Sequence, residues 1–480
     1  MTTTELILQR QVKRRQQRHA FKLMMDMYMR KQLEESSRLS GKTTRPRKAP
    51  ERAQRVQRDP TTGNFVPFSP TDTQWFRMSY SSFKIHLQQV SGDETFRQWS
   101  ASSADAAGKD STPIGLLLLG ALRYLGRAWT FDDLEEATAI SAEIHRSFLH
   151  VYKNWCSTTL FKQYVTYPTL EEAKEYSRDY EMAGFPGCVG SGDGVHVMMH
   201  RCPWKVIQFH KSYKLGFPAR NYNVFVNHRR KIMSCTDGFP ARWNDVTTIK
   251  YDQFARLVAD GKLFGDAEEF YFQLKEKKPD GTIVLVWYRG CYTIVDNGYL
   301  PWPTTIPPQK INDTYDEMRW SKWLESMRKD VECVFGILKA RFTVLKNGIK
   351  LHGVDACDKI FFTCCALHNF ILSEDEKNDE EDQDEDTEEE VEADGISGGV
   401  GRAHEQQPST APRNDDLPLG LQPFADENGV IFVNKLDQDY FMKKLIQHHA
   451  IQHELQLLKW PKNNGLAPPE VILQHSRDGT

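Results

Sequence analysis

Four acidic residues occupy positions where a carboxylate could do chemistry: Asp193, Asp245, Asp296 and Glu332. Asp296 ends a short apolar run over 292–295 and is followed by Asn297-Gly298, a turn signal. This pattern predicts a buried strand that carries a carboxylate at its C-terminal tip. Asp193 lies between two glycines in the middle of a predicted strand over 188–197. A carboxylate there is costly unless it is exposed at a site or bound to a cation.

Glu332 lies on a predicted long helix over 315–342, just off the apolar stripe that would face the core. Gly336, one turn further along, leaves room beside the glutamate for an ion or a nucleic-acid backbone. Arg328, one turn earlier on the same face, supports a different interpretation, in which Glu332 simply forms a surface ion pair. Both interpretations are open from this helix alone.

Asp245 begins a predicted helix over 246–259. Either Asp245 or the neighbouring Asn244 could be its N-cap, because both side chains can accept hydrogen bonds from the free backbone N–H groups of a first turn. A capping role and a metal-binding role are therefore both open for Asp245.

The elements that must position these acids form an α/β pattern. Their order is strand, strand, strand, helix, added hairpin, strand and helix, over 188–197, 221–226, 231–235, 246–259, 270–288, 292–295 and 315–342. A mixed sheet that placed Asp193 and Asp296 on neighbouring strands, with Glu332 facing them from a helix, would resemble the ribonuclease-H architecture. Carboxylates gathered at one point repel one another, and their pKa values rise unless cations neutralise them. Hard divalent ions with oxygen ligands suit such a cluster.

The composition is typical of an intracellular globular protein with several domains. The chain has 480 residues, which suggests about three domains. Its net charge of −3 averages a basic N-terminal arm and an acidic run near residue 380. The nine cysteines are scattered, which predicts reduced thiols. No stretch is apolar for long enough to cross a membrane, and the charged N-terminus argues against a signal peptide.

His196, His200 and Cys202 could be proposed as a zinc site. They lack a fourth ligand at a suitable spacing, and the chain has no Cys-x-x-Cys pair to supply one. Packing roles are therefore the better interpretation of these three residues.

Two N-terminal segments are predicted to precede the α/β region. Residues 1–70 are predicted to be a basic, flexible arm that could contact phosphates, act as a nuclear import signal or simply aid solubility. Residues 71–170 are predicted to be helical, with N-caps at Thr130 and Ser141 on either side of a tight turn.

This second segment is predicted to contain a helix-turn-helix-like unit. The second helix of the unit carries Arg146 and Lys153 on a mildly basic face. DNA contact and plain helical packing are both open for it.

The chain changes character after residue 373. Residues 374–425 are predicted to be an acidic, disordered linker, either a solvated spacer or a nucleic-acid mimic that restrains the basic arm. Residues 426–480 are predicted to carry an amphipathic helix over 437–460. That helix could dock on the core or bind a partner.

Several motifs of this chain resemble the DDE-type transposases of the PIF/Harbinger superfamily, particularly the group called plant transposon proteins. The motifs are Phe76-Arg77-Met78-Ser79, Gly184-Phe185-Pro186-Gly187, Cys202-Pro203-Trp204, Asp296-Asn297-Gly298-Tyr299-Leu300-Pro301, Arg328-Lys329-Asp330-Val331-Glu332-Cys333-Val334-Phe335-Gly336 and Leu367-His368-Asn369-Phe370. The resemblance covers 75–373, and the block that begins at Arg328 is its most specific part. The chain departs from the family pattern at Gly192, where an aliphatic residue is usual, and in the hairpin near Pro279.

The resemblance implies that residues 180–373 form a ribonuclease-H-like endonuclease domain. Its catalytic triad would be Asp193, Asp296 and Glu332, and Asp245 falls where the family has a further acidic residue often assigned to the metal site. These four acids would hold two Mg²⁺ or Mn²⁺ ions. The implied activity is cleavage of DNA phosphodiesters at the ends of an element, followed by attack of the freed 3′-hydroxyl on target DNA.

The resemblance also implies partners and a location. The partners are double-stranded DNA, a Myb-like accessory protein and further copies of the chain in a synaptic complex, and the location is the nucleus. Basic residues that could grip backbone phosphates are Arg229, Arg230, Lys231, Lys339 and Arg341, together with Arg146 and Lys153. Each of them could equally be an ordinary solvated charge. The alternative function is a domesticated descendant that binds DNA or protein without cutting, and the intact acidic set favours the enzyme.

Overall fold

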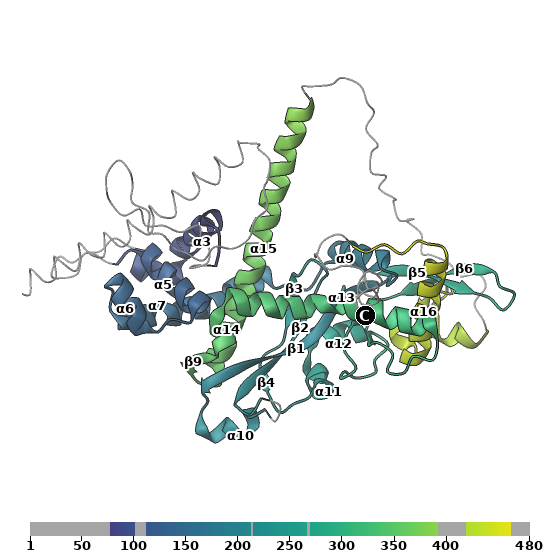
Figure 1. Cartoon of the computed structure of the whole chain (residues 1–480), viewed down its shortest axis with the longest axis horizontal. Coiled ribbons are helices and arrows are strands. Elements are labelled where there is room, and N and C mark those ends of the chain that lie inside the picture. Colours follow the sequence, from purple (N-terminus) through teal and green to yellow (C-terminus); the bar gives the residue numbers. More distant parts are fainter. Residues whose placement is uncertain (1–76, 101–111, 213–214, 266–268, 392–418, 462–480) are drawn as a thin grey trace, which may run out of the picture. The chain divides into compact units, whose positions relative to one another are not determined.

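The computed structural model describes residues 77–100, 112–212, 215–265, 269–391 and 419–461 (Figure 1). The described residues fall into two compact units. One lies within Met1–Thr159 and Lys339–Asn347, and the other lies within Leu160–Leu338 and Gly348–Thr480. Among the helices of these ranges, none is both long enough and apolar enough to span a membrane.

The first unit is helical, as the sequence predicts for this region. Its elements are α3 (Tyr80–Gly92), η1 (Glu94–Phe96), α4 (Arg97–Ser100), α5 (Ile114–Arg127), α6 (Phe131–Thr138), α7 (Ala142–Trp155) and α14 (Thr343–Asn347). The leucines of α5 are buried because this helix is apolar on nearly all sides. Thr130 and Ser141 cap α6 and α7 as predicted, since each side chain accepts a hydrogen bond from a backbone N–H of the first turn.

The predicted short turn joins α6 to α7. Ala139 ends α6 in the left-handed region, with a φ of 55°. The buried Thr138 Oγ1 lies 2.8 Å from His145 Nε2, and this contact ties the end of α6 to the first turn of α7. Burial lowers the pKa of His145 to about 4, so its ring is neutral at physiological pH. The two helices and their turn are present, and DNA binding by them stays a prediction.

The second unit is built on a mixed sheet, which confirms the predicted α/β class. Its strands are β1 (Cys188–Arg201), β2 (Ala219–Val226), β3 (Ile232–Cys235), β4 (Phe239–Pro240), β7 (Tyr292–Ile294), β8 (Thr305–Ile306) and β9 (Ile349–His352). The main path of the sheet is β3-β2-β1-β7-β8, with β4 on β2 and β9 on β1. β1 runs antiparallel to β2 and parallel to β7. The strand that carries Asp193 is therefore adjacent to the strand that leads to Asp296.

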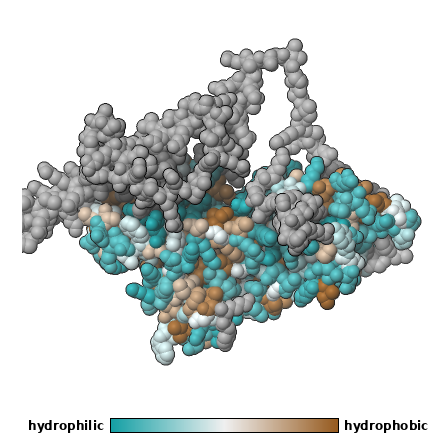
Figure 2. Space-filling view, in the orientation of Figure 1, coloured by the Kyte–Doolittle hydropathy of each residue, from teal (hydrophilic) through white to brown (hydrophobic). Residues whose placement is uncertain are grey.

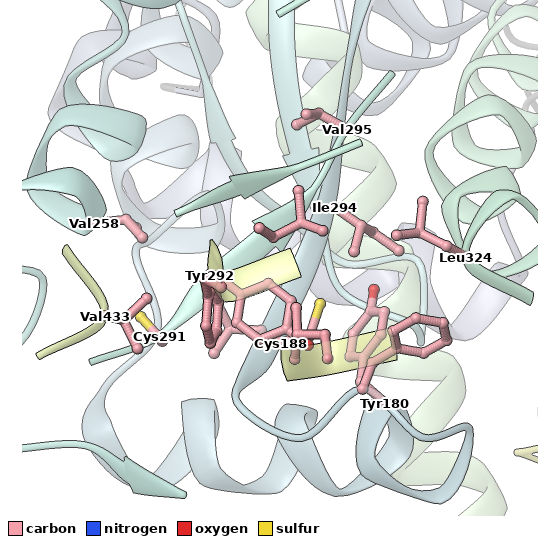
Figure 3. Close-up of a cluster of buried hydrophobic side chains, with 14 of the residues drawn as sticks. Tyr180, Cys188, Val258, Cys291, Tyr292, Ile294, Val295, Leu324 and Val433 are labelled. Carbon is pink, nitrogen blue, oxygen red and sulfur yellow. The ribbon is translucent and has the colours of Figure 1, made fainter. Parts of the chain in front are cut away.

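A hydrophobic core lies against this sheet. Figure 3 shows buried side chains that gather there, among them Tyr180, Cys188, Ile294 and Leu324. They belong to α9 (Leu170–Met182), β1, β7 and α13 (Tyr315–Arg341). Burial on both faces explains the continuous apolar run before Asp296, since such strands do not alternate polar and apolar residues.

α13 confirms the predicted long helix and lies across β1 and β2 in Figure 1. Most of its predicted apolar stripe is buried, namely Trp323, Met327, Val331, Val334 and Leu338. Phe335, predicted in the same stripe, is only half-buried at its edge. Arg328 and Glu332 lie off the stripe, on the side that faces the sheet's acids.

The predicted hairpin forms a second sheet with a short strand from the C-terminal segment: β5 (Tyr271–Lys277), β6 (Ile283–Arg289) and β10 (Ile431–Phe432). The C-terminal helix α16 (Gln438–Glu454) packs on this sheet. There, His448 Nδ1 accepts a hydrogen bond from Lys275 N at 2.8 Å, and Phe441 is fully buried. The predicted amphipathic helix therefore docks on the core of its own unit.

One predicted helix is wrong. The segment 246–259 is divided into α11 (Asp245–Thr248), η4 (Ile249–Tyr251) and α12 (Gln253–Ala259). Asp252 interrupts the helix, because its buried carboxylate accepts from Ala255 N as the N-cap of α12 and from Asn223 Nδ2 on β2. A tertiary hydrogen bond to the sheet thus overrides the local helical periodicity.

The acidic run from Glu374 also differs from its predicted disorder. α15 (Val354–Val391) continues as one helix through most of this run. Glutamate has a high helix propensity, and the extension of an existing helix avoids the unfavourable nucleation step. The remainder of the run, 392–394, the next part of the predicted linker and the predicted arm 1–70 lie outside the described residues.

The remaining elements are short: η2 (Cys156–Leu160), α8 (Phe161–Tyr164), η3 (Trp204–Val206), α10 (Ile207–His210), η5 (Leu419–Phe424) and η6 (Val433–Lys435). Figure 2 shows a mainly hydrophilic face, with hydrophobic residues in small separate groups.

Candidate active site

Asp193 is the first residue of β1 that is not fully buried. The residues before it are buried, whereas its own side chain is 22% exposed. Its Oδ1 accepts from Gly194 N at 2.7 Å. Burial raises the pKa of Asp193 to about 6; the carboxylates of Asp296 and Asp245 act in the same direction. A carboxyl group in this setting gains from any cation that approaches it.

Asp296 lies beside Asp193 because of the strand register. β1 and β7 are parallel, and Ser191 pairs with Ile294. Asp193 on β1 and Asp296, just beyond the end of β7, each come two residues after this pair, so they lie at the same level. Asp296 Oδ1 accepts from Gly298 N at 2.8 Å, which closes the turn after β7.

Asp245 reaches the same place from the start of α11. Asn244 is the N-cap of this helix and accepts from Thr247 N at 3.0 Å, so Asp245 is not the cap. A Cβ on Gly298 would lie 3.0 Å from Asp296 Oδ1 and 3.1 Å from Asp245 Oδ2. The two carboxylates therefore converge on Gly298, and a side chain at this position would press against both.

Glu332 joins this group through Arg328. Arg328 Nη2 donates to Glu332 Oε1 at 2.8 Å, and Arg328 Nη1 donates to Asp193 Oδ2 at 3.3 Å. Glu332 is thus on the same side of the sheet as Asp193. The predicted pair of Glu332 with Arg328 is also present, but it is not confined to the surface, because the arginine side chain is only 17% exposed and extends to Asp193.

Asn221 is a polar residue of this site that the sequence analysis missed. Its side chain is buried on β2, and within the described residues its Oδ1 has no hydrogen-bond partner. A Cβ on Gly194 would lie 3.3 Å from this oxygen and 3.0 Å from Asp245 Oδ1. A buried carbonyl oxygen without a partner is unfavourable until a donor or a cation meets it. The sequence signal for Asn221 is weak, namely a polar residue on a strand that is otherwise mostly apolar.

A buried network behind the acids holds the turn after β7 in place. Asn223 on β2 donates from Nδ2 to Asp252 Oδ2 at 2.6 Å and accepts from Tyr299 Oη at 2.5 Å. Burial raises the pKa of Tyr299 well above its ordinary value, so the phenol stays neutral and can donate. Because Tyr299 belongs to the turn that contains Asp296, the network fixes this turn against β2.

The atoms of this site that could bind a metal ion suit a hard cation. They are carboxylate and amide oxygens, which Mg²⁺ and Mn²⁺ prefer over nitrogen and sulfur ligands. The unpartnered Asn221 oxygen and the raised pKa of Asp193 both fit a site that gains from positive charge. In the described residues, however, no three His, Cys, Asp or Glu side chains lie close enough together to hold a metal ion. The acids converge without reaching coordination geometry.

Two of the predicted DNA contacts are already paired with acids of α9. Arg229 forms ion pairs with Glu175 and Asp179, and Lys231 forms one with Glu172. Their charges are therefore balanced within the protein in this conformation.

The other predicted DNA contacts are dispersed over the two units. Arg146 pairs with Glu143, and the largely buried Lys153 donates to Asn154 Oδ1 at 3.1 Å. The half-buried residues are Arg230, Lys339 and Arg341. Burial also lowers the pKa of Lys339. None of these positions tests a DNA contact, so that role stays a prediction.

Comparisons with known proteins agree with the resemblance carried by the motifs. Residues 162–380 match the family model described as plant transposon protein. The chain is also 22% identical over 214 residues to the mouse (Mus musculus) protein named "Putative nuclease HARBI1", an alignment that covers 44% of this chain and 54% of that relative. The chain thus spans about half the length of the curated relative it matches. No solved structure matches the chain. Together, the two matches support a Harbinger-type, transposase-derived family for residues 162–380.

Proposed function

We propose that this chain is a divalent-metal-dependent DNA endonuclease and strand transferase of a Harbinger-like element. One observation carries the proposal: Asp193, Asp245 and Asp296 converge beside two adjacent parallel strands, and Arg328 links Glu332 to them. The family match and the name of the mouse relative support the same class of activity.

A ribonuclease-H-like architecture is part of this proposal. Three antiparallel strands, β3-β2-β1, continue into the parallel strands β7 and β8, and α13 carries the last acid across this sheet. This is the arrangement that the order of predicted elements suggested for such a fold. It supports the assignment because the acids meet at one place although they are far apart in the chain.

Asp193, Asp245, Asp296 and Glu332 are the residues that would hold the ions. When bound, two Mg²⁺ or Mn²⁺ ions would supply an activated water and neutralise charge on the leaving oxygen. In the first step, the water oxygen bonds to phosphorus and the bond to the 3′ oxygen breaks, which leaves a 3′-hydroxyl. In the second step, this hydroxyl bonds to a phosphorus of target DNA, displaces the target's 3′ oxygen and passes its proton to it.

The proposal includes the partners and location that the sequence resemblance implies. These are double-stranded DNA at the element ends and at the target, further copies of the chain in a synaptic complex, a Myb-like accessory protein and the nucleus. The complete set of acids supports the enzyme over a domesticated descendant that binds DNA or protein without cutting.

Cleavage of DNA that flanks the coding sequence, including any terminal inverted repeats, tests the proposal. The wild-type protein should nick this DNA only when Mg²⁺ or Mn²⁺ is added. Asp193→Asn, Asp296→Asn and Glu332→Gln should each abolish nicking. Matched controls are Glu325→Gln, an exposed acid on the same helix as Glu332, and Asp237→Asn, an exposed acid after β3. Nicking that survives all three active-site changes would rule out the proposed function.

A further inference from the structure

The guanidinium of Arg328 binds the two acids that come from opposite elements of the site. It donates to Asp193 Oδ2 on β1 at 3.3 Å and to Glu332 Oε1 on α13 at 2.8 Å. Asp193 Oδ1 is already used, because it accepts from Gly194 N at 2.7 Å. Both carboxylate oxygens of Asp193 therefore have a donor, and the one that points towards Glu332 is held by Arg328.

A second observation shows that Arg328 does not satisfy every polar group of the site. Asn221 Oδ1 is buried beside Asp245 and has no partner within the described residues. Arg328 satisfies Asp193 and Glu332, but it leaves this oxygen without a donor. The Arg328 guanidinium thus pairs with only some of the oxygen atoms that gather at this site.

We propose that Arg328 is a counter-ion that a divalent cation must displace from Asp193 before the site can work. This inference deepens the proposed function and rests on it. In the free protein, the guanidinium separates the paired carboxylates and lowers their repulsion. When a cation enters, the guanidinium leaves Asp193 and becomes available to a DNA phosphate, which it can bind with two parallel hydrogen bonds.

The positive charge of Arg328 determines how its removal should change the affinity of the site for a metal ion. Arg328 competes with a metal ion for the same oxygen, and it also repels that ion because both are positive. Removal of the arginine charge should therefore strengthen metal binding and weaken the metal-free fold. A residue that merely positioned Glu332 would have the opposite effect on metal binding.

Titration of the full-length protein with Mn²⁺ in the absence of DNA tests this inference. Binding is measured by calorimetry, and thermal unfolding is followed with and without the ion. Arg328→Gln should bind Mn²⁺ about tenfold more tightly than wild type, and its metal-free form should melt at a lower temperature. Lys329→Gln, at the exposed neighbouring position on α13, should match wild type in both measurements. Unchanged or weaker Mn²⁺ binding by Arg328→Gln overturns the inference.

Arg328→Lys covers the case in which the glutamine variant does not fold. Lysine keeps the charge but cannot bridge two carboxylates with a planar fork. The Mn²⁺ affinity of Arg328→Lys should therefore lie between those of wild type and Arg328→Gln. If the glutamine variant cannot be measured, Arg328→Lys should still bind Mn²⁺ more tightly than wild type. Asp193→Asn separates this inference from the proposed function. If wild type binds no Mn²⁺ that depends on Asp193, both fail. If such binding exists but does not respond to Arg328, the counter-ion role alone fails.

Discussion

His228 Nδ1 lies 2.6 Å from Asp330 Oδ2, and both side chains are almost completely buried. Asp330 comes between Arg328 and Glu332 in the chain, but it points away from them, because two residues along an α-helix turn by about 200°. The contact joins the buried face of α13 to the loop after β2. It therefore sets the rotation of the helix that presents Arg328 and Glu332 to Asp193.

Loss of the Asp330 carboxylate should destabilise the second unit. Asp330→Ala leaves the buried His228 ring without this hydrogen-bond partner and should lower the free energy of unfolding by roughly 1–3 kcal/mol. Asp330→Asn keeps a polar partner for the ring and should lower it less. Urea denaturation of both variants measures the difference. Equal midpoints for Asp330→Ala and wild type would show that the pair does not anchor α13.

Asp245→Asn should raise the Mg²⁺ concentration needed for cleavage by about tenfold, because one negative charge is lost where Asp245 faces Asp296. Folding should change little, since Asn244 and not Asp245 caps α11. Asn244→Ala is the matched control: it should lower the free energy of unfolding by about 1 kcal/mol and leave the Mg²⁺ requirement unchanged. A Mg²⁺ titration of Asp245→Asn that overlays the wild-type curve would remove Asp245 from the metal site.

Gly298→Ala should reduce cleavage by about tenfold while the protein stays folded. The new Cβ would lie 3.0 Å from Asp296 Oδ1 and 3.1 Å from Asp245 Oδ2, which is tighter than ordinary contact, so both carboxylates must move. Gly92→Ala adds a Cβ that meets no atom within 4 Å and serves as the control. Initial cleavage rates and circular dichroism of the two variants test this, and wild-type cleavage by Gly298→Ala would mean that the convergence does not matter for the reaction.

His449 should make the second unit sensitive to acid. Its ring packs against Phe185 and Trp323, and within the described residues neither ring nitrogen has a hydrogen-bond partner. Burial lowers the pKa of His449 to about 3, so the folded protein holds the neutral ring. The unfolded chain binds a proton below its ordinary pKa of about 6.5. The neutral His449 ring therefore contributes its full share to stability well above pH 6.5. This contribution falls as the pH drops towards 3, and the loss is about 2 kcal/mol at pH 5.

His449→Phe should remove this loss. Its free energy of unfolding should change between pH 7 and pH 5 by about 2 kcal/mol less than that of wild type. The comparison between two pH values cancels any constant packing difference caused by the larger ring. His453→Gln, on the exposed side of the same helix, should behave as wild type. The same pH dependence in His449→Phe and wild type would contradict the assignment.

Deletion of residues 1–70 tests the predicted basic arm, which lies outside the described residues. If the arm contacts phosphates, its loss should weaken DNA binding for all sequences and flatten the dependence of affinity on salt, because fewer counterions are released. Affinity is measured by fluorescence anisotropy at several salt concentrations. An unchanged salt slope would leave the arm as an import signal or a solubilising tail.

The sequence by itself determined the elements whose patterns are local. The β-branched run that ends at Asp296, the apolar stripe of α13 and the caps at Thr130 and Ser141 all depend on residues a few positions apart. Such patterns are readable because strand alternation, helical periodicity and capping act within one element. The four acids could be selected as candidates for the same reason.

Only the tertiary structure decided how these elements meet. Arg328 and Asp193 are 135 residues apart in the chain, and their contact arises from the packing of α13 on β1. No local pattern shows that Arg328 binds an acid from another element, or that Asn221 is left with an unpaired oxygen. The hydrogen bond from Asn223 to Asp252 likewise divides a segment whose periodicity predicts one helix. Each of these contacts joins residues far apart in sequence, so it forms only after strand register and helix packing have placed both partners.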